Sequence, residues 1–154
     1  MVHDKVCGRA GPDMEPWSLE ELRSGGIQAV LNVSEFESKQ SNFDEAGLEL
    51  EWIPFPASYP ATDETEIQCL ELLPKAYSFV TSCIEKEKTV LVHCSWGRDR
   101  SGLILAYHLA LVMSLSPRNA IAQLSKVRPK AITALGWEEM AVRVIDKLMM
   151  NRKC

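Results

Sequence analysis

The most constraining feature of the sequence is an apolar run that passes directly into a polar, glycine-containing loop. Residues 89–93 (TVLVH) have the pattern of a short strand buried in a parallel sheet. Residues 94–100 (CSWGRDR) form the loop, and residues 101–113 have the length and apolar content of a buried helix. A strand, a short loop and a helix in this order indicate an α/β fold. In such folds, ligands bind at the carboxyl ends of the strands, beside helix N-termini.

Alternating elements are predicted on both sides of this unit. Further strands are expected at residues 6–9, 27–33 and 48–53, and further helices at residues 18–22, 67–84, 117–127 and 136–150. Pro74 lies inside one of these helices and predicts a kink or a break there. The expected fold is one α/β domain over residues 1–154, with a core at about 6–148 and helices flanking a mostly parallel central sheet.

Composition excludes several classes of protein. The chain is 46% apolar and 25% charged, and no apolar run approaches the ~20 residues of a membrane span. Its net charge of -4 argues against a nucleic-acid partner. The first residues lack the apolar stretch of a signal peptide, so a cytoplasmic location is expected. The five cysteines form no CxxC pair and the three histidines are scattered, so neither a disulfide framework nor a metal site is expected.

The loop after residue 93 combines a cysteine with cations and glycines. Cys94 faces a helix N-terminus and two arginines, which should hold it as a thiolate near neutral pH. The residues between Cys94 and Arg100 can curl around a tetrahedral anion with their N–H groups inward, and Arg100 can close the ring as a bidentate fork. Gly97 and Gly102 permit the curvature and close packing. These features suit attack of Cys94 on phosphorus, giving a cysteinyl-phosphate that water then hydrolyses.

The string HCSWGRDRSG at residues 93–102 resembles the phosphate-binding loop (HCxxGxxRSG) of cysteine-dependent protein tyrosine and dual-specificity phosphatases. The small size is similar to the compact dual-specificity group. The resemblance implies Cys94 as nucleophile, Arg100 as phosphate clamp and Ser101 as the hydroxyl that eases thiolate departure. His93 resembles the histidine that orients the loop, and no cofactor or metal is implied. The residues expected to bind the substrate phosphate are Ser95, Trp96, Gly97, Arg98, Asp99 and Arg100.

The general acid is harder to place. In compact dual-specificity phosphatases an aspartate on a separate loop, about thirty residues before the cysteine, protonates the leaving group. Here residues 57–61 (ASYPA) contain no carboxylate. Asp63 has the spacing but also the pattern of a helix N-cap. Asp99 is preferred, because an aspartate directly before the loop arginine resembles a subgroup with phosphoinositide-active members; its alternative role is to pair with Arg98 or a backbone N–H.

The expected function is therefore a dual-specificity protein phosphatase with a phosphorylated protein or peptide as its substrate. A phosphoinositide or inositol phosphate substrate is the alternative, suggested by the GRDR run at residues 97–100. An RNA 5′-phosphatase would use the same loop but suits an acidic chain less. The non-enzymatic alternative is a phosphate-binding module with weak turnover, suggested by the lack of an acid at residues 57–61. Residues 34–37 (SEFE) are interpreted as a surface loop rather than a border of the pocket.

Overall fold

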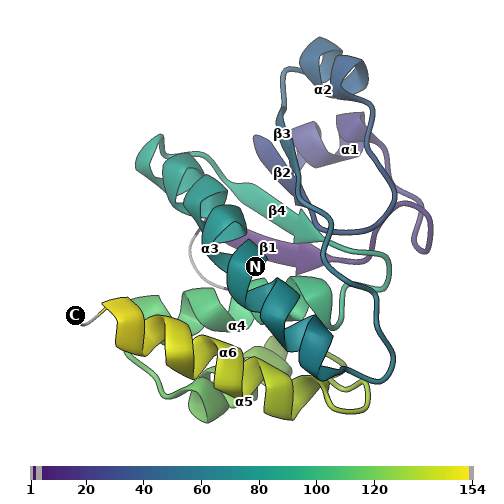
Figure 1. Cartoon of the computed structure of the whole chain (residues 1–154). Helices are drawn as coiled ribbons and strands as arrows, with labels where there is room; N and C mark the ends of the chain where they lie inside the picture. Colours follow the sequence, from purple (N-terminus) through teal and green to yellow (C-terminus); the bar gives the residue numbers. More distant parts are fainter. Residues whose placement is uncertain (1, 3–4, 153–154) are drawn as a thin grey trace.

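The structure is a computed structural model that describes residue 2 and residues 5–152. Four parallel strands form one sheet in the order β1-β4-β2-β3 (Figure 1). The strands are β1 (Val6–Arg9), β2 (Ala29–Asn32), β3 (Glu49–Trp52) and β4 (Val90–His93). In the register of the sheet, His93 lies opposite Arg9 on one side and Asn32 on the other. The carboxyl ends of the strands therefore meet at one edge, with β4 between β1 and β2.

Helices cover both faces of this sheet. They are α1 (Leu19–Ser24), α2 (Gln40–Ala46), α3 (Asp63–Glu85), α4 (Arg100–Val112), α5 (Pro117–Val127) and α6 (Trp137–Arg152). Helices α3 to α6 lie on one side of the sheet and α1 and α2 on the other (Figure 1). This three-layer arrangement confirms the predicted α/β fold with helices flanking a parallel sheet.

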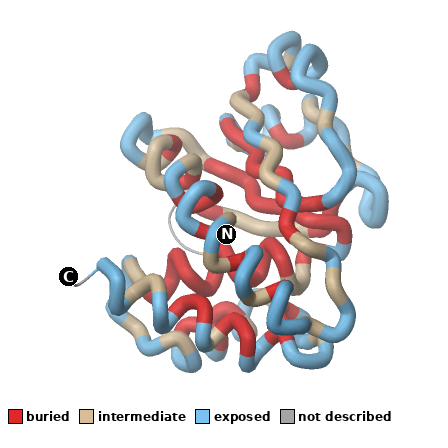
Figure 2. The backbone as a smooth tube through the Cα atoms, in the orientation of Figure 1, coloured by how far each residue is buried: buried red, intermediate tan, exposed pale blue. Residues whose placement is uncertain are grey.

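The alternation of side chains along the strands divides the core in two. Leu31 and Val92 belong to the larger apolar cluster under α3 to α6, whereas Val30 and Leu91 belong to a smaller cluster under α1 and α2. All four are at most 2% exposed, and the central strands form the buried middle of the molecule (Figure 2). Because both faces are covered, β2 and β4 read as continuous apolar runs rather than as alternating ones.

The helix containing Pro74 is not divided, so of the two expected effects, a kink or a break, the break does not occur. Helix α3 is continuous from Asp63 to Glu85, although proline removes one backbone hydrogen bond. Leu73 and Tyr77, on either side of Pro74, are buried in the same core, and the Ser78 hydroxyl donates to the Pro74 carbonyl at 2.9 Å. Tertiary packing on both sides of the proline therefore keeps the helix in one piece.

Two local predictions also need correction. Asp63 is not the N-cap of α3; that position belongs to Thr62, whose hydroxyl accepts from the Thr65 N–H in a capping box. The α2 helix was not expected from its residues, because its N-cap, Lys39, makes no side-chain capping bond. Helix α5 begins at residue 117 as predicted, and α1 begins one residue after its predicted start; Ser116 and Ser18 are their N-caps. None of the helices in the described residues is long and apolar enough to cross a bilayer.

Candidate active site

The loop between β4 and α4 depends on glycine at two points. Gly97 has φ of +69°, and a Cβ there would lie 2.5 Å from the carbonyl carbon of Arg9. A Cβ on Gly102, in the first turn of α4, would lie 2.9 Å from Cγ1 of Ile132. Any larger residue would push the loop away from β1 or α4 away from the segment that follows α5. Both glycines therefore act as predicted, one for curvature and one for close packing.

Three carbonyl oxygens of this loop form hydrogen bonds outside it. The donors are the Gly11 N–H to Ser95 O (2.7 Å), the Arg128 guanidinium to Gly97 O (2.6 and 3.2 Å) and the Ile132 N–H to Arg98 O (3.1 Å). A trans peptide carries its N–H opposite its C=O. The N–H groups of Trp96, Arg98 and Asp99 therefore point the other way, toward the inside of the loop. Converging backbone N–H groups of this kind form a binding site for a tetrahedral anion.

Cys94 lies at the start of the loop, beside the first turn of α4. Its Sγ is 3.4 Å from the Ser101 hydroxyl, and the two residues are 2% and 0% exposed. The Nδ1 of His93 is 3.1 Å from the Cys94 carbonyl oxygen, so Nδ1 carries the hydrogen of this bond. Burial, the largest effect, lowers the pKa of His93 and keeps its ring neutral near pH 7. The sequence-predicted group of Cys94, Ser101 and His93 is thus brought together.

Arg100, the first residue of α4, pairs with a carboxylate that the sequence did not indicate. Its guanidinium donates to Glu35 on the loop after β2 and is itself 8% exposed. Partial burial opposes ionisation of Glu35, but a backbone hydrogen bond and the pairing with Arg100 lower its pKa. The interpretation of residues 34–37 as a plain surface loop is wrong, since Glu35 and Phe36 both line the cleft at Arg100.

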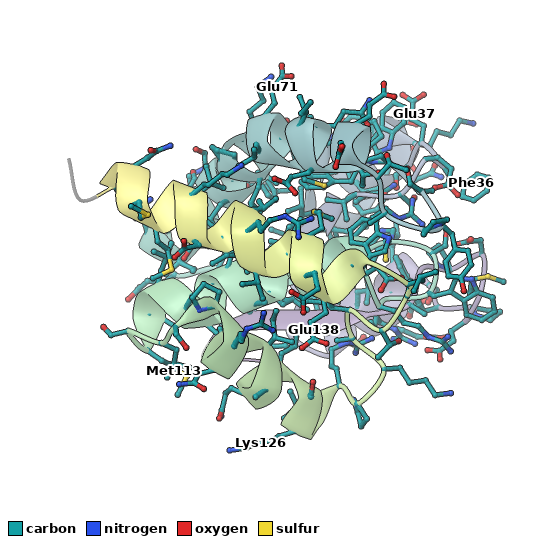
Figure 3. All side chains as sticks on the ribbon, turned by 60° about the horizontal axis from the view of Figure 1, so that its bottom comes forward. Phe36, Glu37, Glu71, Met113, Lys126 and Glu138 are labelled. Atoms are coloured by element: carbon teal, nitrogen blue, oxygen red, sulfur yellow. The ribbon has the colours of Figure 1, made fainter. Side chains whose placement is uncertain are left out.

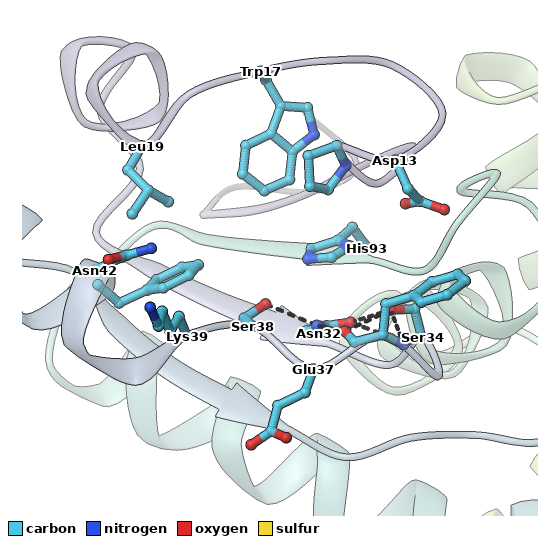
Figure 4. Close-up of a pocket in the computed structure, with 13 residues that line it drawn as sticks. Asp13, Trp17, Leu19, Asn32, Ser34, Glu37, Ser38, Lys39, Asn42 and His93 are labelled. Atoms are coloured by element: carbon cyan, nitrogen blue, oxygen red, sulfur yellow. Dashed lines mark hydrogen bonds between the residues drawn. The ribbon is translucent and has the colours of Figure 1, made fainter.

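Asn32 at the end of β2 holds the loop that carries Glu35. Its amide nitrogen donates to Phe36 O and to Ser38 Oγ, both at 2.8 Å. Its amide oxygen accepts from the N–H and the hydroxyl of Ser34, at 2.9 and 2.7 Å (Figure 4). One buried side chain therefore satisfies four partners and shapes the turn. The only sequence signal for Glu35 was its position directly after a strand that ends beside β4.

A cleft of about 550 Å³ opens above the loop. It is lined by Asp13, Met14, Glu35, Phe36, Ala57, Ser58, Tyr59, Ser95, Trp96, Asp99, Arg100, Ala134 and Trp137. The Ser95 hydroxyl is buried and has no hydrogen-bond partner within the described part of the chain. A bound anion would therefore find an unused donor there, in addition to the backbone N–H groups and Arg100.

A second cavity, of about 260 Å³, lies between His93, the Asn32–Ser38 turn and the α1–α2 side of the molecule (Figure 4). Trp17 forms one of its walls and packs edge-on against His93, with ring centroids 5.4 Å apart. The Trp17 indole N–H donates to Ala10 O at 2.9 Å, which fixes its orientation. This cavity shares Asp13 and Phe36 with the larger cleft.

The two candidate acids lie in different environments. Asp99 lines the cleft, and its Oδ1 accepts from the Ala134 N–H at 3.2 Å. Burial, the largest effect, raises the pKa of Asp99 despite this hydrogen bond and its neighbouring arginines. Asp63 is an exposed residue at the start of α3 and is not among those that line the cleft. Ala57, Ser58 and Tyr59 line the cleft and belong to the segment 57–61, where the resemblance leads us to expect an acid but no carboxylate is present.

The remaining loop residues divide between the cleft and a groove beside it. Trp96 borders both, whereas Gly97 and Arg98 border only the groove, together with Lys130. The Arg98 guanidinium lies 5.2 Å above the centroid of the Trp96 ring, a cation–π contact that holds the indole at the rim. Side chains that can contact a phosphate in the cleft are thus those of Ser95 and Arg100, while Gly97 and Arg98 contribute backbone.

Arg128, directly after α5, connects three segments of the chain. Besides Gly97 O, its guanidinium donates to Gly8 O of β1 at 2.8 Å. We expect Arg128→Met to lower the free energy of unfolding by about 2–4 kcal/mol, because charge-assisted bonds to two carbonyls are lost. Arg118→Met is the matched control, since Arg118 makes only an exposed ion pair with Glu139. Urea unfolding measures both variants, and equal midpoints would contradict the structural role of Arg128.

Comparison with known proteins identifies the family. The family model described as "Dual specificity phosphatase, catalytic domain" matches residues 14–140, which include both sides of the cleft and the whole loop. Human dual specificity protein phosphatase 12 is 32% identical over 132 residues, which cover 85% of this chain and 36% of that protein. The rat protein of the same name is 28% identical over 129 residues, 84% of this chain and 34% of its own. The chain belongs to the dual specificity phosphatase catalytic domain family.

Solved structures agree with this assignment at the level of the fold. Tk-PTP in its active form has a TM-score of 0.75 at 21% identity, with 97% of this chain and 95% of that chain covered. Human DUSP28 has a TM-score of 0.74 at 18% identity, with 97% of both chains covered. The chain spans about a third of the length of the human and rat relatives, so the comparisons describe a domain of those proteins.

Proposed function

We propose that this domain is a dual-specificity protein phosphatase that hydrolyses phosphate monoesters through a cysteinyl-phosphate. The observation that carries the proposal is the loop itself, with backbone N–H groups turned inward between Cys94 and Arg100. Membership of the dual specificity phosphatase family gives the same reaction class. The proposed substrates are phosphorylated tyrosine, serine and threonine in proteins or peptides, and the proposed location is the reducing cytoplasm, where a catalytic thiol survives.

In the first step the Cys94 thiolate attacks phosphorus and the bond to the leaving oxygen breaks. The three equatorial oxygens receive hydrogen bonds from the inward N–H groups, from the Ser95 hydroxyl and from Arg100. Asp99 gives its proton to the departing oxygen. Arg100 lines the cleft and is paired with Glu35 in the free protein, so its guanidinium is held at the cleft before the substrate binds.

In the second step a water molecule attacks the phosphorus of the cysteinyl-phosphate and the S–P bond breaks. The Asp99 carboxylate accepts the proton of this water, so the residue returns to its acidic form. Ser101, whose hydroxyl is 3.4 Å from Sγ, donates to the departing thiolate and lowers the cost of its release. Inorganic phosphate and the free thiolate remain, and the cycle is complete.

Asp99→Asn separates catalysis by Asp99 from its structural contact. The asparagine oxygen can still accept from the Ala134 N–H, so a purely structural role predicts little change in rate. As the general acid, Asp99 contributes about 10²–10⁴-fold with poor leaving groups and much less with good ones. We expect the rate of the variant to depend more steeply on the pKa of the leaving group, measured over a series of aryl phosphates. Asp63→Asn is the control, and an unchanged slope for Asp99→Asn would refute its role.

The raised pKa of Asp99 also predicts a pH dependence. A general acid acts while protonated, so the rate with poor leaving groups falls as pH rises through the pKa of Asp99. Because burial raises that pKa, this fall is expected at a higher pH than for an ordinary exposed aspartate. The pH profile of kcat measured with an alkyl phosphate tests the position, and the profile of Asp99→Asn should lack this limb.

A phosphoinositide substrate is the second candidate. PTPMT1, which shares the fold at 19% identity and a TM-score of 0.72, was crystallised in complex with PI(5)P. In the present chain Arg98 and Lys130 border the groove next to the cleft and offer cations for a second phosphate. Release of phosphate from a soluble phosphoinositide, compared with release from a phosphotyrosine peptide, distinguishes the two substrate classes.

The third candidate, a binding module with weak turnover, predicts tight vanadate binding without hydrolysis.

A further inference from the structure

The mouth of the cleft carries a ring of exposed apolar side chains, which we call the apolar collar. It consists of Met14, Phe36, Tyr59 and Trp96, which are 39%, 57%, 75% and 56% exposed and all line the cleft. Phe36 extends away from the body of the molecule (Figure 3). Exposed apolar groups that gather at one site, rather than scatter, indicate an interaction surface.

The collar is assembled from four separate loops. Met14 follows β1, Phe36 follows β2, Tyr59 follows β3 and Trp96 follows β4. Each side chain therefore reaches the cleft from the carboxyl end of a different strand, and no helical or strand periodicity places them together. Two of them are held in place by neighbours, because the Phe36 carbonyl accepts from Asn32 and the Trp96 ring lies under Arg98. The collar is thus a built feature of the catalytic edge.

The charges around the collar decide between a membrane and a peptide. Asp13, Glu15, Glu35 and Glu37 are exposed acidic residues on the same loops as Met14 and Phe36. A surface that inserts into an anionic leaflet needs cations around its apolar residues, since carboxylates are repelled there. The four carboxylates outnumber the cations Arg98 and Lys130, which border the groove beside Trp96, and the net charge of -4 adds to the repulsion. An apolar surface interrupted by carboxylates matches a peptide with apolar side chains instead.

We propose that the apolar collar binds apolar side chains next to the phosphorylated residue, so that the enzyme prefers phosphopeptides with apolar neighbours on both sides. The inference rests on the proposed phosphatase function and adds a substrate preference to it. The phosphate reaches the loop while the flanking side chains of the peptide pack on Phe36 and Tyr59, which come from the loops after β2 and β3. Burial of these apolar side chains strengthens binding. Polar neighbours would leave these aromatic side chains in water.

The test compares two phosphotyrosine peptides of equal length and charge, one with leucine and the other with serine on each side of the phosphotyrosine. We expect wild-type kcat/KM to be at least about tenfold higher for the leucine peptide, as for other apolar contacts in a binding pocket. The double variant Phe36→Ser/Tyr59→Ser should reduce this ratio to near one. Ile67→Ser is the matched control, because Ile67 is 66% exposed on α3 and does not line the cleft.

Binding and membrane measurements complete the test. Fluorescence anisotropy with the Cys94→Ser protein should give at least about tenfold tighter binding of the leucine peptide, whether or not the wild type turns over. Equal binding of both peptides would refute the collar. Faster phosphate release from phosphatidylcholine vesicles containing a phosphoinositide than from the leucine peptide would assign the collar to a membrane instead. Failure to hydrolyse an aryl phosphate would refute the proposed phosphatase function, while the anisotropy still decides on the collar.

Discussion

Replacing Cys94 with serine is expected to reduce aryl phosphate hydrolysis at least about 10⁴-fold, the scale of losses seen when a catalytic nucleophile is removed. A neutral hydroxyl at this position is a far weaker nucleophile than a cysteine sulfur. The assay measures phosphate release with a chelator present. Cys7→Ser is the matched control, because Cys7 lies on β1, does not line the cleft, and donates through its Sγ to the Val90 carbonyl at 3.6 Å.

The Cys94→Ser result has three informative outcomes. Loss of turnover in a variant with unchanged thermal unfolding supports the cysteinyl mechanism. Equal turnover by both proteins would place the nucleophile elsewhere. Absence of turnover in the folded wild type, with vanadate still bound, would support the phosphate-binding module and refute the phosphatase. Vanadate binding is therefore measured beside the activity for every variant.

Arg100→Lys is the substitution with the second largest expected effect. Lysine keeps the positive charge but loses the planar fork that holds two phosphate oxygens while pairing with Glu35. We expect kcat/KM to fall by about 10²–10³-fold, comparable to removing a preorganised donor of the transition state. A binding measurement with the Cys94→Ser background separates ground-state affinity from the loss in the chemical step.

Arg98→Lys provides the comparison for Arg100. The Arg98 side chain faces the groove beside the cleft and the Trp96 ring. The Arg98→Lys variant should therefore lose less than about tenfold in kcat/KM, the scale of an exposed cation–π contact. If the two lysine variants lose activity equally, charge alone matters at the loop and the bidentate role of Arg100 is wrong. A larger loss for Arg98→Lys than for Arg100→Lys would show that Arg98, rather than Arg100, is the arginine that clamps the phosphate.

The parts that sequence reasoning predicted are those with local signals. The run from residue 89 to residue 102 specifies a strand, a loop and a helix within a few residues, and the structure forms β4 and α4 there. Ser18 and Ser116 cap helices because their hydroxyls bond to N–H groups three residues later. Such contacts are written into short stretches of chain, so the pattern of residue types predicts them.

The parts that it missed depend on contacts between distant residues. Glu35 meets Arg100 across 65 positions, and Arg128 meets Gly8 across 120. Neither pairing has a local pattern, because it depends on which strands become neighbours in the sheet. Pro74 failed as a helix breaker for the same reason, since burial on both sides outweighs the lost hydrogen bond. The helix cap is a local exception: Thr62 rather than Asp63 caps α3, because Thr65, three residues later, completes the capping box.

We expect the carboxylate of Glu35 to make Arg100 selective among the anions that surround it in a cell. A free anion that approaches the guanidinium also meets the negative charge of a carboxylate attached to the protein, so inorganic phosphate should gain less there than at an unpaired arginine. A phosphopeptide gains additional contacts outside the loop and overcomes the same competition. After hydrolysis the remaining phosphate has lost those contacts. If Arg100 binds the substrate phosphate as proposed, we therefore expect the pairing to favour product release and to limit inhibition by ambient phosphate.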